Sequence, residues 1–302
     1  MIELVKNPNI DFMGLRKYAY IFSLVCVIIA LLLLFVKGPR LGVDFTGGAL
    51  IWVKFEKPIE TGDLRVSLGK IGQAQASIQK LAGTNEFVIR SVEKRDPAKF
   101  ADEVTAQLKQ DFKDNLPDLR AKETVEPKIS QELTRDTIFA VLLCLFLMGT
   151  YVWFRFDFRF GAASVISLFH DILITIGALV LTGREFTIPV IGALLTILGY
   201  SINDTIVISD RVREDYRKMR GIPYRDLINN SVNETFSRTM LTGTFVIISL
   251  FCLFFVGGPV IADFAFTLII GLIFGTYSST FVVCALVVEW NEKFPKKTKS
   301  KK

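Results

Sequence analysis

The sequence predicts an α-helical membrane protein with six transmembrane helices and a small α+β domain between the first two. Three observations predict this fold class. Of the 302 residues, 51% are hydrophobic. Uncharged apolar runs long enough to cross a bilayer recur along the chain. A polar segment of the size of a small domain separates the first run from the second.

Six runs reach the length of about 20 apolar residues that a membrane span requires. They cover residues 18–36, 137–154, 160–183, 186–209, 239–256 and 260–288. Three of the runs carry polar interruptions: His170 and Asp171 in the third, Asp204 in the fourth, and Asp263 near the outer end of the sixth. The first run is too long and too firmly flanked for a cleaved signal peptide, and no small-residue cleavage site follows it.

Lysine and arginine gather in regions that lie on one side of the membrane if there are six spans. These regions are residues 6–17, 155–159, 211–225 and 296–302. By the positive-inside rule we expect them, and both termini, to be cytoplasmic. The net charge of +6 then reflects loops that face anionic lipid, and it does not indicate nucleic-acid binding.

The same reasoning predicts four regions along the chain. They are a cytoplasmic N-terminus with the first helix (1–37), an extracytoplasmic α+β domain (38–135), helices two to six with a cytoplasmic loop at 211–237 (136–290), and a basic cytoplasmic tail (291–302).

The extracytoplasmic segment has its own pattern of strands and helices. Residues 49–55 form an apolar strand pattern, and Thr61 is placed to cap a helix that runs to about residue 71. We expect strands at 75–81 and 86–92 joined by a turn at 83–85, a helix opened by Asp96-Pro97 with apolar residues at helical spacing, and a last strand at 124–129. The order β-α-β-β-α-β predicts a ferredoxin-like split βαβ domain.

Asp204 is the most informative residue of the chain. A carboxylate within an apolar span is costly, and such residues normally face a bundle interior or a wet cavity on an ion or proton pathway. Ser201, Asn203 and Thr205 supply hydroxyl and amide groups that can satisfy the carboxylate. The fourth helix is therefore predicted to carry an ion or proton site.

Four sequence blocks resemble the SecF members of the SecD/SecF family of bacterial protein-export membrane proteins, which belong to the resistance-nodulation-division superfamily. These blocks are Leu41-Gly-Val-Asp-Phe-Thr-Gly-Gly48, His170-Asp171, residues 199–214 and Asn233-Glu-Thr-Phe-Ser-Arg-Thr239. The resemblance covers nearly the whole chain. It implies SecD, the SecYEG translocon and a preprotein substrate as partners, ion flow that drives motion of the extracytoplasmic domains, Asp204 as the transmembrane carboxylate, and Arg238 as its basic partner.

Helix geometry agrees with a pairing of Asp204 and Arg238. At 1.5 Å per residue, Asp204 lies roughly 25 Å inward from Thr187, and Arg238 lies roughly 28 Å inward from Gly257, so the two share a layer of the membrane. That layer is in the cytoplasmic half. Arg238 can alternatively extend to the lipid headgroups as an anchor.

Secondary candidates have simpler interpretations. His170-Asp171 can relay a proton, or it can bind a neighbouring helix through hydrogen bonds, which is the interpretation that we favour. Asp210 is expected to pair with Arg211 or Arg213 near the cytoplasmic boundary and to stand outside the ion path.

Two further groups of residues are interpreted as structural. Asp44, Gly47 and Gly48 predict a tight turn from the membrane into the first strand. The four cysteines, Cys26, Cys144, Cys252 and Cys284, lie in apolar spans and predict neither a disulfide framework nor a metal site.

The function predicted from these features is an accessory subunit that couples H⁺ or Na⁺ flow to late steps of protein export. Gly69-Lys70 lacks the rest of a phosphate-binding loop, and no nucleophile is paired with a base, so neither an ATPase, a hydrolase nor a cofactor-dependent enzyme is expected. Two alternatives remain: one half of a small-molecule efflux transporter of the same superfamily, and a structural scaffold of the translocon.

Overall fold

The computed structural model describes residues 9–81, 84–91, 97–219 and 221–294. The chain forms two compact units. One comprises residues 1–40, 140–185 and 189–302 and is called the helical unit; the other comprises residues 41–139 and 186–188 and is called the α+β unit. The predicted turn at residue 83, the helix start at Asp96, Lys6 and the basic tail from residue 296 lie outside the described residues.

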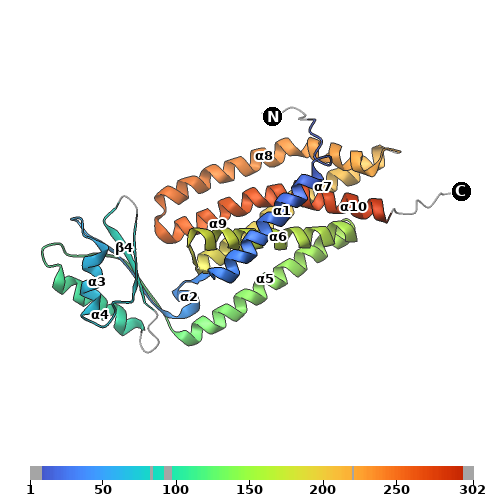
Figure 1. Ribbon diagram of the computed structural model, residues 1–302. Coiled ribbons are helices and arrows are strands. Elements are labelled where there is room, and N and C mark those ends of the chain that lie inside the picture. Colours follow the sequence, from blue (N-terminus) through green and yellow to red (C-terminus); the bar gives the residue numbers. More distant parts are fainter. Residues whose placement is uncertain (1–8, 82–83, 92–96, 220, 295–302) are drawn as a thin grey trace. The chain divides into compact units, whose positions relative to one another are not determined.

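Within the described part of the chain, six helices are long and apolar enough to span a membrane, as predicted. They are α1 (Arg16–Val36), α5 (Pro127–Arg155), α6 (Phe158–Thr182), α7 (Ile188–Lys218), α8 (Tyr224–Val256), and a last helix made of α9 (Gly258–Tyr277), the π-helical turn η1 (Ser278–Val283) and α10 (Cys284–Lys293) (Figure 1). Gly183 ends α6 in the left-handed conformation. Gly258, with φ 75°, interrupts the helical conformation between α8 and α9.

The predicted cytoplasmic loop at 211–237 is wrong in its conformation. α7 continues to Lys218 and α8 already begins at Tyr224, so most of this segment is helical. A search for apolar runs does not detect these helical extensions because they contain many charged residues. These helical extensions are nevertheless amphipathic: Val212, Leu227 and Val232 are buried in a cluster with Val287 of α10.

α6 is the central helix of the helical unit. It contacts α1, α9, η1 and α10, and 56% of its most apolar stretch is buried, against 17% for α1. α7 approaches α9 closely because Gly271 and Gly275, one turn apart on α9, face Ile197 and Ser201, one turn apart on α7. Small residues at this spacing let helix backbones approach in a membrane.

The α+β unit contains a four-stranded antiparallel sheet with two helices. Along the chain it has β2 (Gly48–Lys54), α3 (Thr61–Gly69), β3 (Ser77–Lys80), β4 (Glu86–Ser91), α4 (Pro97–Asp111) and β5 (Asp118–Val125), with the strands in the order β3-β4-β2-β5. Alternate residues of β2, among them Ile51 and Val53, join Leu64 of α3 and Val104 of α4 in one core.

Two details of this unit differ from the predictions. The last strand covers Asp118–Val125 and not 124–129. The prediction missed it because the strand is polar and largely exposed and so lacks an apolar alternation. Residues from Pro127 onward begin α5 instead. Helix α3 is capped by Glu60, in a capping box with Asp63, and Thr61 is its first residue.

A short connection holds the start of α7 within the α+β unit. Strands β1 (Arg40–Leu41) and β6 (Glu185–Phe186) pair, and Gly42 N donates to Phe186 O at 2.8 Å. A side chain at Gly42 would meet Phe186 O at 2.9 Å. The helix α2 (Val43–Thr46) follows, and Asp44 Oδ2 accepts from Ile188 N, in the first turn of α7, at 2.8 Å. Gly47 and Gly48 then adopt φ values of 72° and 128°.

Gly271→Ala is expected to destabilise the protein, because the new methyl group would overlap the buried Ile197 side chain. Overpacking of this kind costs about 1–3 kcal/mol. Gly199→Ala is the matched control, since nothing lies within 4 Å of that position and replacing an exposed helical glycine stabilises by about 0.5–1 kcal/mol. Unfolding of both variants in detergent, compared with the wild type, checks the difference; equal stability of the two variants would contradict the close approach.

Asp44→Ala is expected to loosen the first turn of α7, because Ile188 N loses its acceptor. Loss of such a cap costs about 0.5–2 kcal/mol. Amide hydrogen exchange at Ile188, Val190 and Ile191 should become faster in Asp44→Ala and stay unchanged in Glu56→Ala, an exposed residue of the same unit. Unchanged exchange in Asp44→Ala would show that the cap is not formed.

Candidate functional site

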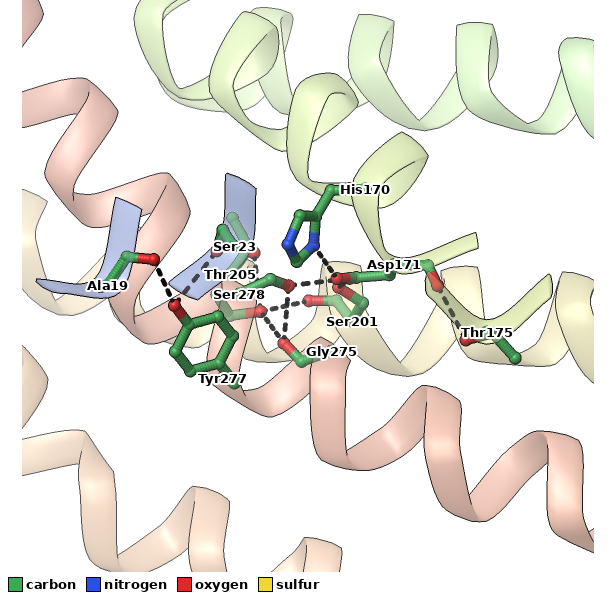
Figure 2. Close-up of polar contacts among 11 residues, drawn as sticks. Ala19, Ser23, His170, Asp171, Thr175, Ser201, Thr205, Gly275, Tyr277 and Ser278 are labelled. Carbon is green, nitrogen blue, oxygen red and sulfur yellow. Dashed lines mark hydrogen bonds and ion pairs between the residues drawn. The ribbon is translucent and has the colours of Figure 1, made fainter. Parts of the chain in front are cut away.

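The helical unit encloses a carboxylate that is completely shielded from solvent. Asp171 of α6 has an exposed fraction of 0%. Ser201 of α7 donates to its Oδ2 at 2.7 Å, Ser278 of η1 donates to the same oxygen at 2.8 Å, and His170 Nδ1 lies 3.0 Å from Oδ1. Figure 2 shows these side chains converging on Asp171. Three helical segments therefore meet at one buried acid.

The π-helical turn η1 supplies the hydroxyl groups of this cluster. Ser278, Ser279 and Thr280 are all buried in it. Ser279 Oγ lies 2.8 Å from Gly275 O and 3.0 Å from Ser201 O, and Thr205 Oγ1 donates to Ser279 Oγ at 3.2 Å. A π turn shifts the side chains that follow around the helix, and such turns occur frequently at functional sites.

Asp204 lies on α7 at the edge of this cluster. Its side chain is half-buried, and Thr276 Oγ1 of α9 donates to its Oδ2 at 3.3 Å. Thr276 precedes Ser278, the donor to Asp171, by two residues. The stretch 276–279 therefore contacts both carboxylates, one through Thr276 and the other through Ser278.

Tyr277 connects the cluster to the first helix. Its hydroxyl donates to Ala19 O at 2.8 Å and lies 3.1 Å from Ser23 Oγ, both on α1 (Figure 2). The centres of the Tyr277 and His170 rings are 6.5 Å apart. His170 Nε2 is buried and has no hydrogen-bond partner among the described residues.

The predicted site residues divide into two groups. Ser201 and Thr205 are buried in the cluster with Asp171, and Asp204 borders it. Asn203 and Arg238 are exposed. Within the described part of the chain, no ion pair joins Arg238 to Asp204 in this conformation.

The predicted partner of Asp210 is wrong. Asp210 is exposed and faces Arg155 of α5, with Nη2 3.7 Å from Oδ1. Arg211 instead forms ion pairs with Asp215 one turn ahead on α7 and with Glu234 of α8. Asp210 and Arg211 are adjacent on the helix and point in different directions, whereas Arg211 and Asp215, four residues apart, share a face.

Several site residues escaped the sequence argument. Thr276, Tyr277, Ser278 and Ser279 form a polar run inside the sixth apolar span, and that run was the available signal. Asp215 was also missed: it is fully buried and accepts from Ser231 Oγ at 2.8 Å. Asp215 lies six residues beyond the predicted end of the fourth span, among charged residues that the sequence argument interpreted as a loop.

The chemistry open to this site is that of oxygen ligands and a proton carrier. Carboxylates and hydroxyls from α6, α7 and η1 can hold a proton, and the same oxygen atoms are ligands for a hard cation such as Na⁺. Among the described residues, no group of three or more His, Cys, Asp or Glu side chains is arranged to hold a metal ion.

Comparison with known proteins relates this geometry to a family. The family model "Protein export membrane protein SecD/SecF, C-terminal" matches residues 104–293, and the "SecD/SecF GG Motif" model matches residues 32–59. The chain belongs to the SecD/SecF family. The motif match contains Asp44 and the Gly47-Gly48 pair, and the longer match contains the whole polar cluster outside α1.

Curated relatives in the SecD/SecF family match nearly the whole of this chain. The protein translocase subunit SecF of Desulfurispirillum indicum is 39% identical over 94% of this chain and 93% of its own length. The protein translocase subunit SecDF of Thermus thermophilus is 41% identical over 95% of this chain, but only 39% of its own length is covered.

A crystal structure of SecDF from Thermus thermophilus, described as a translocon-associated membrane protein, has the same fold over the shared region. The TM-score is 0.84 at 40% identity, and the match covers 94% of this chain and 39% of the SecDF chain.

Proposed function

We propose that this protein is an accessory subunit of the Sec translocase that couples H⁺ or Na⁺ flow to late steps of preprotein export, acting with SecD and the SecYEG translocon. The observation that carries this proposal is the near full-length match to SecF translocase subunits in the SecD/SecF family. The buried polar cluster in an otherwise apolar helix bundle supports the ion-coupling part.

In this proposal the chain lies in the bacterial cytoplasmic membrane with both termini and the 211–237 segment on the cytoplasmic side. The lysine and arginine distribution supports that orientation. The segment 38–135 is then an extracytoplasmic domain. Its β-α-β-β-α-β order and its sheet order β3-β4-β2-β5 support its assignment as ferredoxin-like.

Asp204 is the proposed ion-carrying group and Arg238 its partner. An apolar environment stabilises a protonated carboxyl group, whereas an approaching guanidinium stabilises the ionised form. Arg238 is exposed in the conformation described and lies on the helix that follows α7. A shift of α8 relative to α7 that brings Arg238 toward Asp204 would release the ion to the opposite side. A membrane potential of 100 mV supplies about 2.3 kcal/mol per charge for such a shift.

SecD is the proposed source of the other half of the pathway. The SecDF chain of Thermus thermophilus matches this chain over 39% of its length, so a further region accompanies the shared one there. A partner that supplies a second set of helices is consistent with the superfamily's construction from repeats. Motion of the extracytoplasmic domain would then act on the emerging preprotein.

Asp204→Asn is expected to abolish gradient-stimulated export while membrane insertion stays intact, because asparagine keeps the shape of the side chain and removes its titration. The measurement is preprotein translocation into membrane vesicles with and without an ion gradient, at equal protein abundance. Asp210→Asn, an exposed position of the same helix, is the control and should export normally. Normal stimulation in Asp204→Asn would refute the assignment.

Arg238→Lys is expected to impair export although it keeps the charge, since lysine lacks the planar guanidinium that binds a carboxylate in two places. Arg217→Lys, exposed on α7, serves as the control in the same vesicle assay. If Arg238→Lys and Arg238→Ala both export like the wild type, Arg238 is a lipid anchor and the proposed pairing fails.

A further inference from the structure

The stretch 276–279 joins two acids that belong to different helices. Asp204 on α7 accepts from Thr276, and Asp171 on α6 accepts from Ser278 and Ser201. Ser201 lies one turn before Asp204 and Thr205 on the same helix. A set of polar side chains therefore extends from the half-buried acid to the fully buried one.

Both carboxylate oxygens of Asp171 have polar partners. Two serine hydroxyls satisfy Oδ2, and His170 Nδ1 contacts Oδ1. His170 is the titratable group in direct contact, and α7 and η1 present serines to Asp171. Tyr277, at the end of α9, contacts α1, and its ring is tilted 31° to the His170 ring at a centroid distance of 6.5 Å. A buried acid with a buried imidazole beside it can hold one proton or two.

His170 supplies an independent observation. Its exposed fraction is 7%, and Nε2 has no partner among the described residues. Buried polar atoms are nearly always paired, so an unpaired ring nitrogen calls for a state in which it is used. When Nδ1–H donates to the Asp171 carboxylate, the Nε2 lone pair is free to accept a proton, and the resulting imidazolium can release it again.

We propose that Asp171 and His170 form a second proton-holding site that works in series with Asp204, with the stretch 276–279, which donates hydrogen bonds to both acids, linking the two. In the transfer step, the Asp204 carboxyl group releases its proton and the Asp171 carboxylate takes one up. The net result is an ionised Asp204 and a protonated Asp171. This inference rests on the ion-coupling function proposed above, and it selects H⁺ as the ion for this site.

The test separates titration from structural support. In the purified full-length protein, pH-jump infrared difference spectra should contain a carboxyl signal that Asp171→Asn removes and a second one that Asp204→Asn removes. Proton flux in vesicles that also contain the partner chain should fall about tenfold or more in Asp171→Asn. Thr276→Val should reduce flux while both carboxyl signals remain, and Thr196→Val, exposed on α7, should change neither.

Each failure has its own meaning. A purely structural Asp171 predicts a lower melting temperature in Asp171→Asn with no missing carboxyl signal and with wild-type flux per folded molecule, and that result would overturn the proposal. If Asp171→Asn does not fold, unchanged flux in both Thr276→Val and Ser278→Ala overturns it instead. If the wild type shows the Asp171 carboxyl signal and proton flux but an ion gradient does not stimulate its preprotein export, the export function alone is contradicted.

Discussion

The need to satisfy a carboxylate inside an apolar bundle governs the arrangement of the helical unit. Asp171 makes its contacts on three segments, α6, α7 and η1. Leaving such a group unpaired away from water costs several kcal/mol. The helices must therefore approach closely enough for serine side chains, which are short, to reach it. Gly271 and Gly275 on α9 make that approach possible.

The same constraint accounts for the π-helical turn. An uninterrupted α-helix through Ser278–Val283 would leave successive side chains at their regular 100° spacing. The extra residue in the turn lets Ser278 and Ser279 both face the polar cluster, while Val283 and Cys284 remain in the apolar core. The π-helical turn therefore places the serine hydroxyls toward their polar partners and the apolar side chains toward the core.

Charge is also paired at the polar end of the bundle. Arg211, Asp215 and Glu234 connect α7 with α8, and Ser231 donates to Asp215 Oδ2. Asn229 and Asn233 of α8 bind the backbone of Ile10, and Phe12 packs against Phe236. These contacts explain why α7 and α8 continue as helices beyond their apolar cores: their polar extensions bury side chains and find partners.

Hydropathy by itself determined the six membrane helices, because an apolar run of span length has few alternatives to a helix in a membrane. It also singled out Asp204, since a charge in such a run is conspicuous. Only the tertiary structure decided that Asp171 is fully buried, because its burial depends on α7 and η1 packing over α6. The pairing of Asp210 with Arg155 and the position of the polar strand β5 were decided in the same way, by neighbours distant in sequence. A side chain's direction and its partners are properties of packed helices and paired strands, and no local pattern encodes them.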